Sequence, residues 1–189
     1  EGAKPIPIAL DGLSVVVNKD INIANLTIDQ LAMIFAGEIT SWKAVGGPDL
    51  PIEVINRDET SGTYGAFWEL VCQKKYGADI KYTKNAVVAK ENGEVAAKVA
   101  STPHAIGYVG MAFVDQVKSA GGKTLMVNGV EPTIQNVIDK KYPISRYLYL
   151  VTRGDAKDGS LEKAFINFVL SAKGQAIVQS VDYIPLPKN

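Results

Sequence analysis

A short polar stretch, residues 55–63 (INRDETSGT), contains the side chains best suited to chemistry. Arg57 follows an apolar segment, and its guanidinium can donate two parallel hydrogen bonds to an oxyanion. Ser61, Gly62 and Thr63 come next and open a helical pattern. The first N–H groups of a helix lack internal partners and carry partial positive charge, so they favour a small anion. Because glycine has no side chain, Gly62 would let such an anion approach the backbone.

The same residues also allow a purely structural interpretation, and the sequence leaves both open. Ser61 or Thr63 could simply cap the helix. Arg57 could pair with Asp58 or Glu59. An acidic residue beside an anion makes sense if Glu59 orients the arginine and accepts a hydrogen bond from a protonated oxyanion.

Asp11, which precedes Gly12 within a long apolar stretch, is a second candidate acceptor. A carboxylate there could accept a proton from a protonated oxyanion if it faced a cleft. The alternative is that Asp11 is a turn or hinge residue. The Asp11-Gly12 pair itself predicts a bend, or a close approach of another segment, within the first strand.

Composition excludes several classes of function. The chain has 189 residues, and its 20 basic and 20 acidic side chains give a formal net charge of zero. Nucleic acid is therefore not expected as the main partner, since neutralising phosphates needs a basic excess. One cysteine and one histidine exclude an intrachain disulfide and argue against a metal site. We expect no cofactor and no catalysis, because Ser61 lies in T-S-G-T rather than in G-x-S-x-G.

Strand and helix patterns alternate along the chain, which predicts an α/β protein with mixed or parallel sheets. Strands are expected over residues 5–18, 51–56, 105–109, 125–127 and 147–152. Helices are expected over residues 25–37, 64–77, 92–100, 132–140 and 161–170, with a continuation or restart over 171–179. Asn25 or Thr27 would cap the first helix and Gly37 would end it.

Four other reactive side chains are expected to be structural. Cys72 lies beside apolar residues within a helical pattern and is interpreted as a small buried hydrophobe. Tyr108 is expected to pack in the core, with cleft lining as the alternative. His104 follows Pro103 in a loop and is expected near the surface. Arg146 is expected to be structural, with contact to a cleft as the lesser alternative.

Several segments, taken in order along the chain, resemble the phosphate-binding component of the bacterial and archaeal phosphate ABC importers. They are residues 9–18 (ALDGLSVVVN), 26–47, 55–63, 104–110 (HAIGYVG), 142–152 (YPISRYLYLVT) and 165–186. In that family an R-x-x-x-S-G-T loop contacts phosphate. The resemblance implies that Arg57, Ser61, Gly62 and Thr63 bind phosphate, with Glu59 and Asp11 as candidates for supporting contacts.

The resemblance also implies an architecture and a role. The fold would be that of a type II periplasmic-binding protein, with two lobes, mixed sheets and phosphate in the cleft between them. Residues 13–105 would form the second lobe, residues 1–12 and 106–189 the first, and strands near 8–17 and 106–110 the hinge. The chain would be an extracytoplasmic solute-binding protein, in the periplasm or on the cell surface as a lipoprotein, serving an ABC transporter permease. The alternative is a phosphate-sensing or interaction protein that a partner chain completes.

The start of the chain departs from the family pattern. Family members carry an N-terminal βαβ portion before the ALDG-type strand, which brings a Gly-Ser-Thr-rich helix start and an acidic residue to phosphate. This sequence begins at Glu1, just before that strand. We therefore expect a fragment, a processed product or a short form, whose first lobe exposes a sheet edge and an apolar face. Such a chain alone should bind phosphate more weakly than a complete member, unless a further segment or a second chain completes the lobe.

Overall fold

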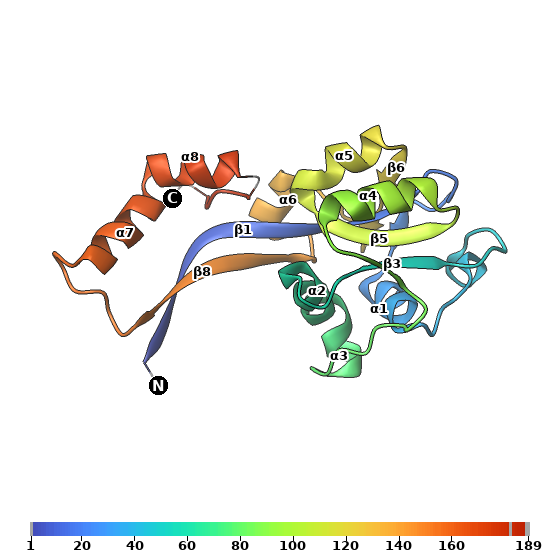
Figure 1. Cartoon of the computed structure of the whole chain (residues 1–189), viewed down its shortest axis with the longest axis horizontal. Helices are drawn as coiled ribbons and strands as arrows, with labels where there is room; N and C mark the ends of the chain where they lie inside the picture. The colour runs from blue at the N-terminus through green and yellow to red at the C-terminus, as the bar shows by residue number, and fades with distance from the viewer. Residues whose placement is uncertain (1, 182, 188–189) are drawn as a thin grey trace.

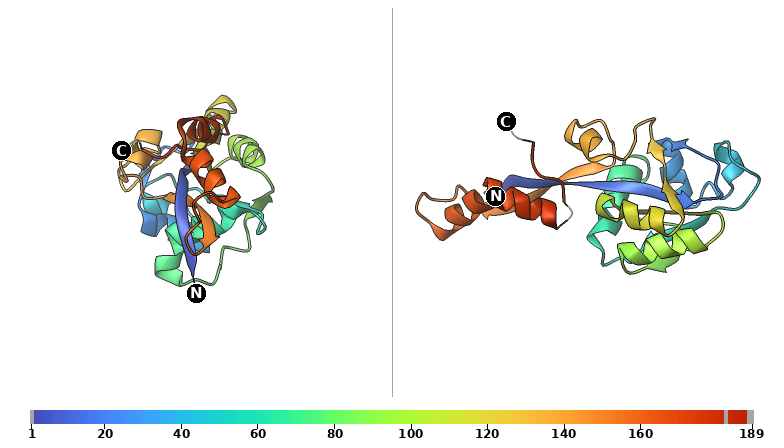
Figure 2. Two further views of the ribbon diagram at one scale, coloured as in Figure 1. Left: turned by 90° about the vertical axis from the view of Figure 1, so that its left-hand side faces the viewer. Right: turned by 90° about the horizontal axis from the view of Figure 1, so that it is seen from above.

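The computed structural model describes residues 2–181 and 183–187 and shows a larger body joined to a smaller one by two long strands (Figure 1). These strands are β1 (Ala3–Asn18) and β8 (Ser145–Arg153), which pair antiparallel with Asp11 opposite Arg146. Figure 2 shows from above how they leave the larger body and carry the smaller one at their far end. The predicted α/β class with mixed sheets is confirmed, because parallel and antiparallel pairs share one sheet.

The central sheet has the strand order β4-β3-β5-β1-β6, and β8 pairs with the other half of β1. Its remaining strands are β3 (Glu53–Arg57), β4 (Val87–Ala89), β5 (Ala105–Gly110) and β6 (Gly122–Thr124). Pairs β3–β4 and β3–β5 are parallel, whereas β1 is antiparallel to β5 and β6. A second, two-stranded sheet joins β2 (Asn25–Leu26) to β7 (Met126–Val127).

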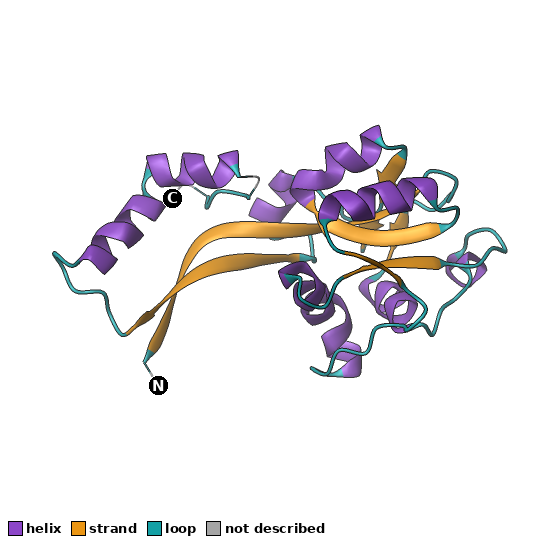
Figure 3. Cartoon of the chain, viewed as in Figure 1, coloured by secondary structure: helices purple, strands orange, loops and turns teal. Residues whose placement is uncertain are grey.

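Helices cover both faces of the central sheet (Figure 3). The α-helices are α1 (Ile28–Ala36), α2 (Gly62–Phe67), α3 (Gln73–Tyr76), α4 (Asn92–Ser101), α5 (Val114–Ser119), α6 (Ile134–Ile138), α7 (Leu161–Leu170) and α8 (Ala172–Ser180). Short 3-10 helices span Trp42–Val45 and Met111–Phe113, and a π-helical turn over Trp68–Cys72 joins α2 to α3. Thr27, not Asn25, caps α1, because its hydroxyl accepts from the N–H of Gln30. Ser171 separates α7 from α8, so the last helix restarts.

Two apolar clusters hold the larger body together, one on each side of the sheet. Phe35 of α1, Phe67 of α2 and Tyr108 of β5 are fully buried on one side, and the last two rings stack with centroids 3.9 Å apart. Val95 and Val99 of α4 are fully buried on the other side. Each such side chain contributes about 1.5–3 kcal/mol when it leaves water. These contacts fix the ends of β3 and β5, where the polar side chains of interest begin.

The predicted division into lobes differs from the observed packing. Residues 106–144, expected in the first lobe, pack with the larger body: Ile106 and Tyr142 lie in the same buried cluster as α1. β5 was expected as a hinge strand, but β3 and β1 pair with its two edges and residues 105–109 are all buried. The second connecting strand is therefore β8. β1 was also expected as a hinge strand, and Figure 1 shows that it runs from the larger body to the smaller one.

The smaller body contains the first half of β1, most of β8, α7 and α8 (Figure 1). Several of its large apolar side chains face solvent: Val151 is 65% exposed, Phe165 55% and Leu161 86%. The expected uncovered apolar face is thus present. Residues 1, 182, 188 and 189, which were also assigned to the first lobe, lie outside the described residues. Within the described ranges, no helix combines the length and apolar character needed to cross a membrane.

Candidate functional site

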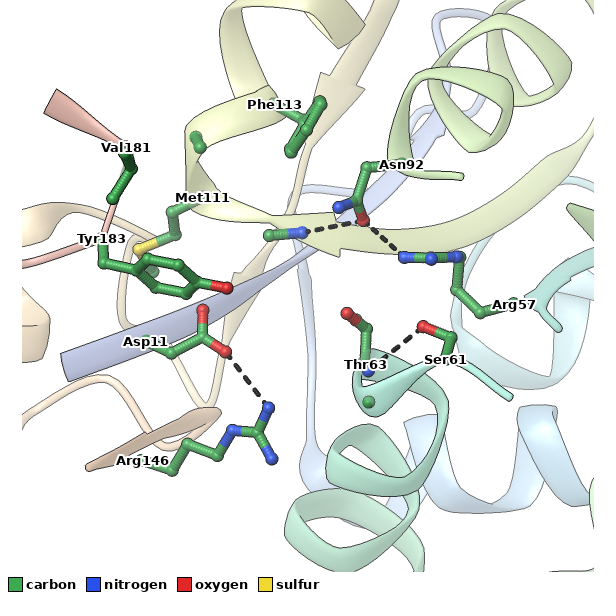
Figure 4. A pocket seen from close by; sticks show the side chains of 13 residues that line it. Asp11, Arg57, Ser61, Thr63, Asn92, Met111, Phe113, Arg146, Val181 and Tyr183 are labelled. Atoms are coloured by element: carbon green, nitrogen blue, oxygen red, sulfur yellow. Dashed lines mark hydrogen bonds and ion pairs between the residues drawn. The ribbon is translucent and has the colours of Figure 1, made fainter. Parts of the chain in front are cut away.

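A cavity of about 510 Å³ lies where β1 and β8 meet the larger body (Figure 4). Its lining comes from strand ends, helix starts and the C-terminal tail. The lining residues are Asp11, Arg57, Ser61, Gly62, Thr63, Asn92, Gly110, Met111, Ala112, Phe113, Arg146, Val181 and Tyr183. All four residues expected to bind an anion therefore share one cavity.

Arg57, the last residue of β3, is held in place by two hydrogen bonds. Its Nη1 donates to Oδ1 of Asn92 at 2.8 Å and its Nη2 donates to the backbone carbonyl of Lys90 at 3.0 Å. Among the described residues these are its partners, instead of Asp58 or Glu59. The residue is 8% exposed, and its Nε is buried without a hydrogen-bond partner. A buried guanidinium charge without a carboxylate partner is unfavourable, so an anion in the cavity that Arg57 lines would be stabilised.

The Ser61–Thr63 segment begins the helix that faces Arg57. Ser61 caps α2, because its Oγ accepts from the N–H of Thr63 at 3.1 Å. Capping and anion binding are compatible here, since the hydroxyl can still donate its own hydrogen. A side chain placed on Gly62 would meet no protein atom within 4 Å. The backbone at Gly62 is thus open to the cavity, as close approach of a ligand requires.

Asp11 and Arg146 form the wall opposite Arg57, Ser61 and Thr63 (Figure 4). They face each other on paired strands, and Nη2 of Arg146 lies 3.4 Å from Oδ2 of Asp11. Burial raises the pKa of the Asp11 carboxyl, and the nearby guanidinium partly opposes this. Arg146 was expected to be structural, with cleft contact as the lesser alternative, and the structure places it in the cavity.

Glu59 does not line the cavity and is exposed on the outer side of its loop. The loop turns there because Oδ1 of Asp58 accepts a hydrogen bond of 3.0 Å from the N–H of Thr60. The expectation that Glu59 accepts a proton from the anion therefore lacks the necessary geometry. Asp11 is the candidate carboxylate that lines the cavity.

The sequence did not single out Asn92 or Tyr183 as site residues. Asn92 was noted only as the entry to a helix, and Arg57 lies 35 residues before it, so no local pattern pairs the two. Tyr183 reaches the cavity because the next residue, Ile184, exchanges two backbone hydrogen bonds with Leu10, of 2.8 and 2.9 Å. No local pattern predicts a contact between segments so far apart in sequence.

The other reactive side chains have structural surroundings. Cys72 is buried, which raises the pKa of its thiol to about 12 and keeps it protonated. The backbone carbonyl of His104 accepts a 2.9 Å hydrogen bond from the indole of Trp42. Tyr108 packs in the core, as predicted, and donates to Oδ1 of Asn56 at 2.6 Å. Across residues 2–181 and 183–187, no three His, Cys, Asp or Glu side chains gather as metal ligands.

Comparison with known proteins identifies the class to which this fold and cavity belong. The PBP superfamily domain matches residues 1–173, and the chain belongs to that superfamily. It is 38% identical, over 97% of its length, to the phosphate-binding protein PstS of Borreliella burgdorferi. It is 32% identical, over 95% of its length, to the protein of the same name from Bacillus subtilis. The chain spans 66% and 56% of the lengths of these two relatives.

A solved structure gives the same result. It is that of a putative phosphate ABC transporter substrate-binding protein from Clostridium perfringens with bound phosphate. It is 34% identical, and the match has a TM-score of 0.77 and covers 98% of this chain and 73% of the other. The family resemblance expected from the INRDETSGT loop and the flanking segments is therefore confirmed.

Proposed function

We propose that the chain binds inorganic phosphate in the cavity between β1, β8 and the larger body, as the solute-binding component of an ABC phosphate importer. The relatives named as phosphate-binding proteins support the ligand, and the Clostridium perfringens protein supports the transport context. By the same analogy the chain acts outside the cytoplasm and delivers phosphate to a membrane permease. It captures and releases its ligand without chemical change.

Arg57 is the observation that carries this proposal. Its side chain is buried and fixed by Asn92 and Lys90, yet its Nε has no acceptor within the described residues. The guanidinium lines the cavity, and a phosphate oxygen there would pair with its positive charge through a charge-assisted hydrogen bond, which is stronger than a neutral one. The Ser61 hydroxyl and the open backbone at Gly62 lie beside the same space and offer further donors.

The lining also favours binding over catalysis. An activated nucleophile needs a base within hydrogen-bond reach, usually oriented by a third group. The Ser61 hydroxyl instead accepts from the Thr63 backbone, and neither His104 nor Cys72 lines the cavity. The Asp11 carboxylate lies on the wall opposite Ser61 and contacts Arg146, so it is not placed to activate that hydroxyl, and such a site retains an oxyanion without transforming it.

Isothermal titration calorimetry of the 189-residue chain with inorganic phosphate tests the proposal. We expect a saturable heat with one phosphate per chain. Nitrate serves as the matched control, because it is planar and cannot donate a hydrogen bond to Asp11. Incubation with a chromogenic phosphate ester should release no product. Equal heats for phosphate and nitrate, or steady turnover of the ester, would contradict the assignment.

A further inference from the structure

A second arginine faces the same cavity as Arg57, from the opposite wall. Arg146 lies near the start of β8, and Figure 4 shows its guanidinium on the side of the cavity that faces Thr63. Its Nε is buried and has no hydrogen-bond partner among residues 2–181 and 183–187, as is also true of the Nε of Arg57. Two arginines thus line one cavity from separate walls.

The contact between Arg146 and Asp11 does not account for the whole arginine side chain. An arginine that serves mainly to pair with a carboxylate usually forms two parallel hydrogen bonds of about 2.7–2.9 Å. Here the recorded contact joins one nitrogen, Nη2, to one oxygen, Oδ2, at 3.4 Å. The Arg146 side chain remains 32% exposed, while that of Asp11 is 13% exposed. Asp11 therefore helps to position Arg146 but does not occupy all of its hydrogen-bond donors.

We propose that Arg146 is a second anion-contacting residue and that Asp11 is its positioning residue. The site then holds a tetrahedral oxyanion between guanidinium groups from two walls, Arg57 on β3 and Arg146 on β8. This inference rests on the proposed function and deepens it by assigning ligand contacts to the β1–β8 wall. Charge supports it: among the described lining residues, Arg57 and Arg146 face one carboxylate, that of Asp11, which leaves these three an excess of one positive charge when all are ionised.

The main alternative is that Arg146 only compensates the buried charge of Asp11. The two roles differ in what happens when Asp11 is neutralised. If Arg146 contacts the anion, its loss weakens binding whether or not residue 11 carries a charge. If Arg146 only compensates Asp11, its loss has no further effect once Asp11 is replaced by asparagine.

A double-mutant cycle read by phosphate calorimetry separates the two roles. The variants are Arg146→Gln, Asp11→Asn and the double substitution, with Arg153→Gln as the matched control. Arg153 is an exposed arginine at the far end of the same strand. We expect Arg146→Gln to weaken phosphate binding by roughly tenfold to a hundredfold, alone and in the Asp11→Asn background. Arg153→Gln should bind as the unsubstituted chain does.

Equal phosphate affinity for Asp11→Asn and the double variant would overturn the inference and leave the proposed function intact. If the unsubstituted chain failed to bind phosphate at all, both the inference and the proposed function would be contradicted.

Circular dichroism confirms that each variant is folded. If Arg146→Gln does not fold, Arg146→Lys provides the test, because lysine retains the charge but loses the planar fork. A several-fold loss of affinity in folded Arg146→Lys supports direct contact, and unchanged affinity contradicts it.

Discussion

Arg57 and Asn92 are joined by a 2.8 Å hydrogen bond, and the same Asn92 oxygen accepts a second bond, of 3.3 Å, from the N–H of Gly110. One amide oxygen thereby connects the end of β3, the start of α4 and the end of β5. The Arg57 side chain, which lines the cavity, is thereby held in place before a ligand arrives. Donors fixed in advance avoid the cost of ordering a side chain on binding.

Arg57→Ala should remove most phosphate binding while the chain stays folded. The substitution deletes a charge-assisted hydrogen bond worth roughly 1.5–3 kcal/mol, or about one to two orders of magnitude in Kd. Calorimetry with phosphate measures the loss, and circular dichroism verifies the fold. Wild-type affinity in a folded Arg57→Ala protein would remove the basis of the assignment.

Substitutions at Asn92 should show that this residue orients Arg57. Asn92→Ala removes the acceptor for Nη1 and should weaken phosphate binding several-fold, less than Arg57→Ala does. Asn92→Asp keeps an acceptor of the same shape but adds a negative charge beside the anion, so it should bind phosphate more weakly than Asn92→Ala. Asn85→Ala, at an exposed site, is the control. Unchanged phosphate affinity in folded Asn92→Ala would show that Asn92 does not act through the arginine.

The parts of the site that are adjacent in sequence were predictable, and the parts that topology brings together were not. Arg57, Ser61, Gly62 and Thr63 lie within seven positions, so a strand end followed by a helix start already places them together. Arg146 is 135 residues from Asp11, and only the antiparallel pairing of β8 with β1 joins them. Hydrophobic patterning identifies strands but does not say which strands are neighbours.

The difference between local and long-range contacts also explains which features of the fold were predicted correctly and which were not. The helix α1 was predicted with Asn25 or Thr27 as its cap, and the structure selects Thr27 because it forms a local capping box with Gln30. The close approach expected at Asp11-Gly12 is present, since a side chain on Gly12 would lie 2.6 Å from the sulfur of Met111. The strand 105–109 was also found, but its short apolar run could not reveal that it lies between β3 and β1.

Gly62→Val should reduce phosphate binding more than Ser61→Ala or Thr63→Val. The two hydroxyl substitutions each remove one neutral hydrogen bond, worth about 0.5–1.5 kcal/mol, and leave the helix start in place. The valine side chain would project into open space at Gly62, so it should exclude the ligand without disturbing the fold. Calorimetry and thermal unfolding together measure both effects. Normal phosphate binding by Gly62→Val would contradict the proposed close approach to the backbone.

Asp11→Asn should stabilise the chain progressively as the pH rises. Burial raises the pKa of Asp11 above its ordinary value of 3.8, so the folded chain holds this proton more tightly than the unfolded chain. The free energy of unfolding therefore falls as the pH rises from that value through the higher folded pKa. Asparagine does not titrate, so it adds no such pH dependence to the stability.

Urea unfolding from about pH 4 to about pH 7 should show that the stability of Asp11→Asn relative to the unsubstituted chain increases with pH. The exposed Asp20→Asn is the control, and an advantage that shrank with pH would contradict the shift.

Phosphate should be preferred to sulfate, and Asp11 should be the reason. Near neutral pH phosphate still carries a proton that it can donate to the Asp11 carboxylate, whereas sulfate has none and would face that carboxylate unpaired. A site that accepts a ligand hydrogen rejects an analogue without it, and we expect a preference of roughly a hundredfold or more. Competition calorimetry at neutral pH measures the ratio of the two dissociation constants.

Asp11→Asn should bring the two dissociation constants closer together, chiefly by improving sulfate binding, because its amide can donate to either anion. Glu59→Gln should leave the ratio unchanged, since Glu59 lies outside the cavity. Equal affinities for the two anions in the unsubstituted chain would contradict the predicted preference. A ratio that changes in Glu59→Gln but not in Asp11→Asn would show that Asp11 is not the group that accepts the phosphate proton.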